Sequence, residues 1–409
     1  MSRRDVVMVT IDSWRADAVE RMDTPDRLVA AGYEQSEAIA GAAATHGAFP
    51  PLLASTHAIH AYTDAGQLRP TVETMSDRLA EVGYATAGFV ASNPFLSKYD
   101  DRFDRFWNDE LGDPTGDWHG TLDRVRRFLT LQKRVPAPAV AARAREWFET
   151  TPPPRFLWIH LMDVHGPYFP GLRRARRVGL ARTYATLSRY HIADTEHSVL
   201  KDDLRALYRA CVDRLDASLS SVVEFVPDDA VVVCTADHGE EFDHGYHGHG
   251  QLYDECVRVP LFARGIDAPL AETTVRHVDL PPTILDSVDV GPPSDWRGSR
   301  VDGTDRPALL ANHSPALGQT SVGVRTARHK YLRAYDDTSW SVDREELYDL
   351  RADPDEQSAI TDESVRSRLS DTVDEFLTGD GADLDVIRDT STGIDADVHD
   401  RLAELGYVE

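Results

Sequence analysis

DAVVVCTADHGEEFDHGYHGHG, residues 229–250, joins an apolar stretch to a group of acidic and histidine residues. Its first part is a short run of β-branched residues, which is typical of a strand buried on both faces of a parallel sheet. The run leads into the adjacent pair Asp237 and His238. Because open α/β sheets place their active sites at the carboxyl ends of strands, this stretch predicts chemistry at one edge of such a sheet.

Two other segments repeat this arrangement. DVVMVTI, residues 5–11, leads into Asp12, and RFLWIHLMD, residues 155–163, ends in Asp163. Between them, TVETMSDRLAEVGYATAGFVAS has the pattern of a helix, a glycine cap and a strand. Residues 204–225 carry apolar side chains at helical spacing. We therefore predict an α/β fold with a doubly wound, mostly parallel sheet.

The pattern changes after about residue 302. SVGVRTARHKYLRAYDD and EELYDL indicate a short antiparallel sheet in a smaller C-terminal subdomain. We expect a catalytic α/β domain at residues 1–301 and the subdomain at 302–409. Segments at about 109–154 and 171–199 lack strand patterning and are interpreted as insertions. The arginines of the second segment favour a surface helix paired with local acids over an anion site.

The composition narrows the class of protein. The formal net charge is -25, with acidic residues spread along the whole chain, so nucleic acid is not an expected partner. This acidic surface is typical of a halophilic, salt-adapted protein. The sequence has no apolar run near the length of about 18 residues that spans a membrane, and MSRRDVVMVT leads directly into a strand. We expect a cytoplasmic protein without a membrane span, in which Cys211, Cys234 and Cys256 are small core residues.

A metal site is the first function suggested by these residues. Carboxylate oxygens and imidazole nitrogens are ligands for divalent ions such as Mn²⁺ and Zn²⁺. Asp12 can meet Asp237 and His238 across adjacent strand ends, which predicts one divalent metal ion. The alternative is a solvated histidine-rich loop. Further imidazoles follow in that loop: His244, His247 and His249.

The chain resembles the sulfatase family of the alkaline-phosphatase-like superfamily. The resemblance covers nearly the whole chain and rests on collinear motifs: VTIDSWRAD, HLMDVHGPY, TADHGE, HGHGQLYDECVRVPL, HVDLPPTIL, VRTARHKYLR and ELYDLRADPDE. It implies an alkaline-phosphatase-like α/β sheet with a smaller C-terminal subdomain, and a metal-dependent hydrolase of sulfate or phosphate esters. With its acidic composition, the chain is similar to a haloarchaeal-type member of this family.

The resemblance places Thr45 at the nucleophile position. The family carries a CxPxR motif there, whose cysteine or serine is oxidised to formylglycine, whereas this chain has THGAF at residues 45–49 and cannot form formylglycine by that route. A threonine hydroxyl on a divalent metal can attack phosphorus or sulfur directly. Relatives with a threonine nucleophile, including phosphodiesterases, act on phosphate esters. The alternatives are a structural helix N-cap and an inactive site.

The resemblance also implies roles for other histidines. His165 is expected to contact the sulfuryl or phosphoryl oxygens, and His249 the substrate or the leaving group. We expect Asp163 and His247 in the same substrate site. The family's two-metal relatives have DxxxH where this chain has Asp163 and His165 as DxH, which favours one metal.

Neighbouring positions refine the metal site. Ser13 stands where many sulfatases have a second ligand aspartate, so Thr45 and water are expected to complete the ligands. The single imidazole of His238 favours Mn²⁺ or Zn²⁺ over Ca²⁺, with Mg²⁺ left open. His160 is interpreted as a core histidine and Lys330 as a structural lysine.

Three functions stay open at this point. The first is a hydrolase of small anionic esters, with sulfated or phosphorylated glycans among the candidate substrates; Thr45 favours phosphorus over sulfur. The second is a phospho-group transferase with a Thr45-linked intermediate, although such enzymes normally carry membrane helices. The third is a non-catalytic binding protein on a sulfatase fold. The presence together of five candidate site residues argues against it: Asp12, Asp237, His238, His165 and His249.

Overall fold

The computed structural model describes residues 3–63, 66–108, 129–131, 134–190, 197–245, 248–379 and 384–392. Its centre is an eight-stranded sheet with the order β4-β3-β5-β1-β6-β7-β2-β8. The strands are β1 (Val6–Ile11), β2 (Glu34–Ile39), β3 (Ala85–Val90), β4 (Arg105–Asn108), β5 (Arg155–Leu161), β6 (Val231–Ala236), β7 (Arg258–Arg264) and β8 (Val275–Arg276). From β4 to β6 all neighbours are parallel, while β7 is antiparallel to β6 and β2. The predicted mostly parallel sheet is confirmed.

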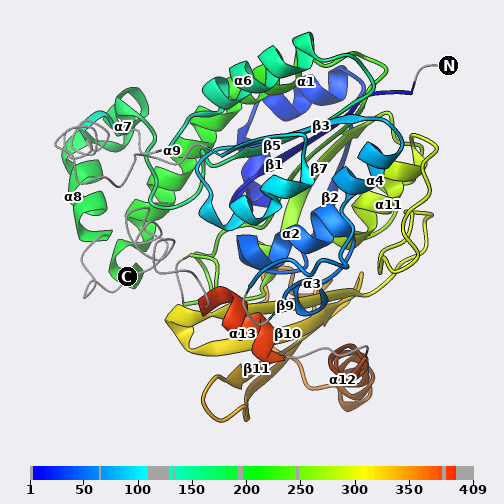
Figure 1. Cartoon of the computed structure of the whole chain (residues 1–409). Coiled ribbons are helices and arrows are strands. Elements are labelled where there is room, and N and C mark those ends of the chain that lie inside the picture. Colours follow the sequence, from blue (N-terminus) through cyan, green and yellow to red (C-terminus); the bar gives the residue numbers. More distant parts are fainter. Residues whose placement is uncertain are drawn as a thin grey trace.

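Helices cover both faces of this sheet (Figure 1). One layer contains α1 (Thr24–Ala30), α6 (Ala137–Thr150) and α9 (His197–Val223), and the other contains α2 (Thr45–Ala54), α4 (Met75–Glu81) and α11 (Leu280–Asp286). The remaining short elements are η1 (Ala16–Arg21), α3 (Ala58–Ala61), η2 (Pro94–Arg102), α7 (Leu172–Val178), α8 (Leu180–Tyr190), α10 (Asp254–Val257), η3 (His277–Asp279) and η4 (Pro315–Leu317). Among the helices described, none is long and apolar enough to cross a bilayer.

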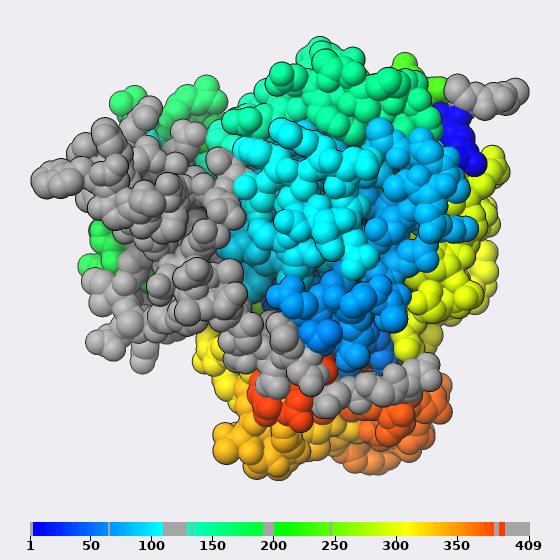
Figure 2. Space-filling view, viewed as in Figure 1, coloured from blue at the N-terminus to red at the C-terminus, as the bar shows by residue number. Residues whose placement is uncertain are grey.

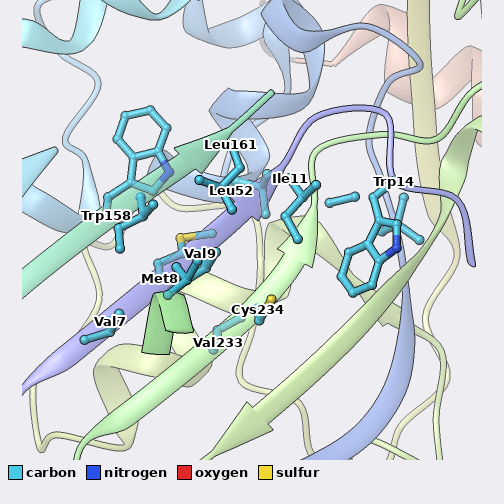
Figure 3. Packing of buried hydrophobic residues seen from close by; sticks show 14 of the residues in the cluster. Val7, Met8, Val9, Ile11, Trp14, Leu52, Trp158, Leu161, Val233 and Cys234 are labelled. Atoms are coloured by element: carbon cyan, nitrogen blue, oxygen red, sulfur yellow. The ribbon is translucent and has the colours of Figure 1, made fainter. Parts of the chain in front are cut away.

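The apolar runs seen in the sequence form the centre of the core. Every residue of β1 and of β6 is buried, because each strand has strands on both sides and helices on both faces. Figure 3 shows Met8 and Val9 of β1 packed near Val233 and Cys234 of β6. The three cysteines are all buried and unpaired, as predicted.

A second, four-stranded sheet follows in the chain. Its order is β12-β11-β10-β9 and all its pairs are antiparallel, as predicted. The strands are β9 (Ala308–Ser314), β10 (Gln319–Arg325), β11 (His329–Asp336) and β12 (Val342–Asp349), followed by α12 (Glu363–Thr378) and α13 (Leu384–Thr392). These elements form the yellow-to-red layer at the bottom of Figure 2. The domain boundary between residues 301 and 302 stays a prediction.

A buried ion cluster joins the two sheets. Lys330 of β11 is fully buried, and its Nζ lies 2.9 Å from Asp254 Oδ1 and 3.0 Å from Glu356 Oε1. Arg325 contacts the same Asp254 carboxylate at 2.9 Å. Burial alone would raise the pKa of Asp254, but Lys330 and Arg325 hold it well below its usual value. Lys330 therefore has a structural role, as its sequence context indicated.

We expect Lys330→Met to lower the free energy of unfolding by roughly 3–5 kcal/mol, because it removes the counter-ion of the buried Glu356 and leaves Asp254 with arginine partners only. Urea denaturation measures this change. Lys201→Met is the matched control, since Lys201 pairs with Asp243 at the surface and should lose less than about 1 kcal/mol. Equal losses in the two variants would contradict a structural role for the buried cluster.

Candidate active site

Three adjacent strands bring polar side chains to one edge of the large sheet. Asp12 follows β1, Asp237 and His238 follow β6, and His165 lies shortly after β5. Since β5, β1 and β6 are neighbouring parallel strands, their carboxyl ends meet at the same edge. All four side chains are buried. The structure therefore brings together Asp12, Asp237 and His238, which the strand pattern predicted, and His165, which the resemblance implied.

Asp12, Asp237 and His238 form a candidate metal site. Each offers a ligand atom, and these atoms lie within 4.8 Å of one another. His238 Nε2 is 3.8 Å from Asp12 Oδ1 and 3.7 Å from Asp237 Oδ2. His238 Nδ1 donates to the Gly239 carbonyl at 2.8 Å, which leaves Nε2 as the nitrogen that faces the carboxylates.

The charges of this cluster fit a cation. Asp237 Oδ1 accepts from the backbone N–H groups of His238 and Ser13, but its buried Oδ2 has no hydrogen-bond partner in the described structure. Burial, followed by the charge of Asp12, raises the pKa of Asp237 to about 8. Burial also opposes ionisation of Asp12, yet His165 and the neighbouring imidazoles lower its pKa. Two carboxylates with an unsatisfied oxygen are the arrangement that a divalent ion neutralises.

Thr45 lies directly beside this cluster. It is the first residue of α2, and its Oγ1 donates to Asp12 Oδ2 at 3.3 Å and lies 3.4 Å from His238 Nε2. Ala44 occupies the N-cap position, so the alternative reading of Thr45 as the helix N-cap is wrong. The positive end of the α2 dipole therefore lies beside the Thr45 hydroxyl, where it favours negative charge.

Two histidines complete the group. The rings of His165 and His249 are 5.2 Å apart, and the His249 ring is 4.7 Å from that of His238. Burial lowers the pKa of His165 to about 3, so this ring is neutral. Burial also opposes a charge on His249, but a hydrogen bond at 3.3 Å to Glu240 Oε1 outweighs it and raises the pKa of His249. Of these two imidazoles, His165 is thus neutral and His249 favours the protonated form.

Some expected residues lie elsewhere. The Asp163 carboxylate accepts from Ala137 N at 2.9 Å, at the start of α6, and lies 3.8 Å from Arg214 Nε. These contacts give it a structural setting, and no described contact joins it to Asp12. His244 stacks on Tyr253 at 3.7 Å, away from the candidate metal ligands. His247 lies outside the described residues.

Two residues beside Asp12 were not assigned to the site from the sequence. Asn93, just after β3, donates to Asp12 Oδ2 at 3.2 Å, while its own Oδ1 accepts from Phe95 N. His160 was interpreted as a core histidine; it is fully buried, but its Nε2 lies 3.6 Å from Asp12 Oδ2. The signal for Asn93 was its place at a strand end, the same signal that identified Asp12.

Ser13 orients both carboxylates. Its Oγ donates to Asp12 Oδ1 at 2.9 Å and its N–H donates to Asp237 Oδ1 at 3.3 Å. The residue has a φ of 60°, in the left-handed region that serine rarely adopts. Strained backbone of this kind is found at functional sites, where the surrounding structure maintains it.

Comparison with known proteins places the chain among sulfatases. The sulfatase family profile matches residues 4–290, well over half of the chain. An N-acetylglucosamine-6-O-sulfatase of Bacteroides thetaiotaomicron is 29% identical over 177 residues, which cover 37% of this chain and 31% of that protein. The chain thus matches only about a third of the length of that curated relative.

Solved structures share the fold over almost the whole chain. A 2-O GAG sulfatase superimposes with a TM-score of 0.66 at 15% identity, covering 98% of this chain and 96% of that one. The phosphonate monoester hydrolase of Agrobacterium radiobacter has a TM-score of 0.65 at 16% identity, covering 92% and 95%. Because the sequence identities are this low, the similarity shows the fold alone. That fold is alkaline-phosphatase-like, with the two sheets described above.

Proposed function

Because the chain belongs to the sulfatase family, we propose that it is a metal-dependent hydrolase of sulfate or phosphate esters with Thr45 as its nucleophile. The observation that carries this proposal is the position of the Thr45 hydroxyl, 3.3 Å from Asp12 Oδ2 beside the candidate metal ligands. A hydroxyl in a buried group of carboxylates and imidazoles has no evident packing role. It is well placed to be activated for attack.

Asp12, Asp237 and His238 would hold the ion. A divalent cation bound there supplies Lewis-acid polarisation of the ester and lowers the pKa of a neighbouring hydroxyl. The donor set of two carboxylates and one imidazole suits Mn²⁺ or Zn²⁺. The unpartnered Asp237 Oδ2 and the raised pKa of Asp237 support the presence of such an ion in the working protein.

The proposed reaction has two displacements. In the first, Thr45 Oγ1 bonds to the phosphorus or sulfur atom while the bond to the ester oxygen breaks, and the threonine proton passes to the acceptor it already faces, Asp12 Oδ2. In the second, water attacks the same phosphorus or sulfur atom and the bond to Thr45 Oγ1 breaks. Asp12 returns the proton to Oγ1, the water proton passes to His249, and inorganic phosphate or sulfate departs, or a phosphate monoester when the substrate is a diester. The N-terminus of α2 stabilises the negative charge that develops beside Thr45.

His165 and His249 have complementary roles in this proposal. The buried, neutral His165 ring donates from Nδ1 to the Gly166 carbonyl, so its Nε2, 3.8 Å from Asp12 Oδ1, faces the site as a hydrogen-bond acceptor for a water or a substrate hydroxyl. His249, hydrogen-bonded to Glu240, is placed to give a proton to the departing alcohol. Glu240 then stabilises the position of His249 and its charged form.

Phosphate esters are the favoured substrate class, because Thr45 cannot provide the formylglycine hydrate that expels sulfate by elimination. The similar solved proteins include both sulfatases and phosphonate monoester hydrolases, so the fold accommodates both chemistries. One similar structure is described in complex with D-glucosamine-2-N,6-O-disulfate, and an anionic glycan ester is therefore a candidate substrate here. We also propose a cytoplasmic location and a salt-adapted surface, the latter on the net charge of -25.

The test is a panel of nitrophenyl sulfate, phosphate monoester and phosphodiester in high salt, measured with Mn²⁺ and with a chelator. We expect phosphate ester cleavage that falls at least about a hundredfold on chelation and returns with the metal. Fastest cleavage of the sulfate ester would contradict the preference for phosphorus. Activity unaffected by the chelator would contradict the metal site.

A further inference from the structure

A tyrosine of α9 holds the loop that follows β1. Tyr208 is buried, and its hydroxyl makes two hydrogen bonds to the backbone of that loop, although it lies 195 residues after Ser13 in the chain. The hydroxyl donates to the Ser13 carbonyl at 2.9 Å and accepts from the Arg15 N–H at 3.0 Å. A phenol has one proton to donate and lone pairs that accept, so a single hydroxyl makes both bonds at once. Tyr208 thus bridges residues 13 and 15.

The residue at one end of this bridge has a strained backbone. Ser13 has a φ of 60°, and this left-handed conformation costs a serine free energy. Among the described residues, only Tyr208 hydrogen-bonds to the Ser13 carbonyl or to the Arg15 N–H. A rotation of Ser13 toward a more favourable φ would turn its buried carbonyl away from the hydroxyl and leave it unsatisfied. The Tyr208 hydroxyl therefore opposes the relaxation of Ser13.

Ser13 in this conformation contacts both carboxylates of the candidate metal site. Its Oγ donates to Asp12 Oδ1 at 2.9 Å, and its N–H donates to Asp237 Oδ1 at 3.3 Å. The angle between the N–H and the side chain of a residue depends on φ, so a change in φ would separate at least one of these donors from its acceptor. The carboxylates would then be less well oriented for an ion.

The other end of the bridge leads toward the proposed proton donor. Arg15 Nη1 donates to the Glu240 carbonyl at 2.6 Å, and Glu240 Oε1 lies 3.3 Å from His249 Nδ1. The Tyr208 ring packs edge-on against Phe242 in the same loop, with the ring centroids 5.5 Å apart. This ring contact does not need the hydroxyl, so Tyr208→Phe removes the bridge and keeps the packing.

We propose that Tyr208 is a positioning residue of this active site. Its hydroxyl holds Ser13 in the left-handed conformation in which Ser13 orients Asp12 and Asp237 for a divalent cation. The inference rests on the proposed function, because it assumes that these two carboxylates hold an ion. Removing a group that orients metal ligands through hydrogen bonds typically lowers metal affinity by about 10- to 100-fold.

Tyr208→Phe tests this role through the affinity for Mn²⁺ rather than through turnover. We expect calorimetry to give a Kd for Mn²⁺ about tenfold or more above that of the wild-type protein. Tyr84→Phe is the matched control, because the buried Tyr84 hydroxyl donates to the Arg4 carbonyl at 2.9 Å, before the start of β1, and its loss should leave Kd unchanged. A purely structural role for Tyr208 would lower the urea midpoint of both variants and leave both Kd values at the wild-type level, and that result overturns the proposal.

Two backgrounds test whether Tyr208 acts through the conformation of Ser13. Ser13→Ala and Ser13→Gly both lack the serine hydroxyl, but only glycine adopts a φ of 60° without strain. We expect Tyr208→Phe to raise Kd by about tenfold in the Ser13→Ala background and by at most about threefold in the Ser13→Gly background, a difference that a double-mutant cycle measures. Equal factors in the two backgrounds overturn the role of Ser13 in the proposal.

The failure of this inference is distinguishable from that of the proposed function. A wild-type protein that binds no Mn²⁺ overturns the metal site and the positioning role together. Mn²⁺ binding that Tyr208→Phe leaves unchanged overturns the positioning role alone, and the turnover of Thr45→Ala tests the nucleophile separately.

Discussion

Replacing Thr45 with alanine is expected to lower kcat by at least about a thousandfold while Mn²⁺ binding is retained, because the nucleophile is lost and the two carboxylates and the imidazole that hold the ion stay in place. The change removes one hydroxyl and one hydrogen bond to Asp12, and Ala44 already occupies the N-cap position. Turnover of the most active nitrophenyl ester measures kcat, and calorimetry with Mn²⁺ measures the retained ion.

Two controls make this result specific. Thr45→Ser keeps a hydroxyl at the same place and should retain measurable turnover. Thr56→Ala removes a buried threonine located further along the same segment and should remain close to wild type. If Thr45→Ala stays fully active, the nucleophile is a different group. If Thr45→Ala loses both turnover and Mn²⁺, Thr45 is needed as a ligand as well as a nucleophile.

The strand ends of the sheet could be predicted from local sequence. Continuous β-branched runs identify strands buried on both faces, and the residue after each run lies at the sheet edge whatever the exact length of the strand. This reasoning placed Asp12, Asp237 and His238 together, and the structure brings their ligand atoms within 4.8 Å. The convergence depends only on strand order, which parallel α/β connections restrict strongly.

The orientation of side chains beyond the strand ends could not be predicted in the same way. Asp163 and His165 are two residues apart after β5, yet His165 faces Asp12 and Asp163 accepts from Ala137 N at the start of α6. That difference is set by the packing of α6, whose sequence lies elsewhere in the chain. Asn93 was not predicted as a site residue for another reason. An amide is not a usual metal ligand or acid–base group, yet its N–H can orient a carboxylate, as that of Asn93 does for Asp12.

The positions of the histidines in the loop after β6 could not be predicted from residue types alone. His244 and His249 have the same sequence context, but His244 stacks on Tyr253 and His249 lies against the ring of His238. Glu240 decides the role of His249 because it provides the hydrogen bond at 3.3 Å that favours the charged ring. Such pairings depend on a loop conformation that residue types alone do not specify.

Asp237→Asn is expected to abolish most Mn²⁺ binding and to stabilise the metal-free protein at the same time. The substitution removes a ligand charge from the cluster, so the ion loses a principal partner. At a Mn²⁺ concentration near a hundred times Kd, the wild-type protein should gain about 2.7 kcal/mol of unfolding free energy, and the variant should gain little of this. Asp229→Asn, on the exposed turn before β6, is the matched control and should behave as wild type.

The stabilisation of the metal-free variant follows from the pKa of Asp237. Burial and the charge of Asp12 raise that pKa to about 8, so between about pH 4 and pH 8 the folded wild-type protein holds a proton that the unfolded chain has released. Its stability without metal therefore falls as the pH rises through this window, whereas the asparagine variant lacks this dependence. We expect the variant to be more stable at pH 8, by up to about 5 kcal/mol for a window of about four pH units, and equal near pH 4. Urea denaturation in chelator at both pH values measures the difference, and a variant that is less stable at pH 8 would show that Asp237 supports the fold rather than a bound cation.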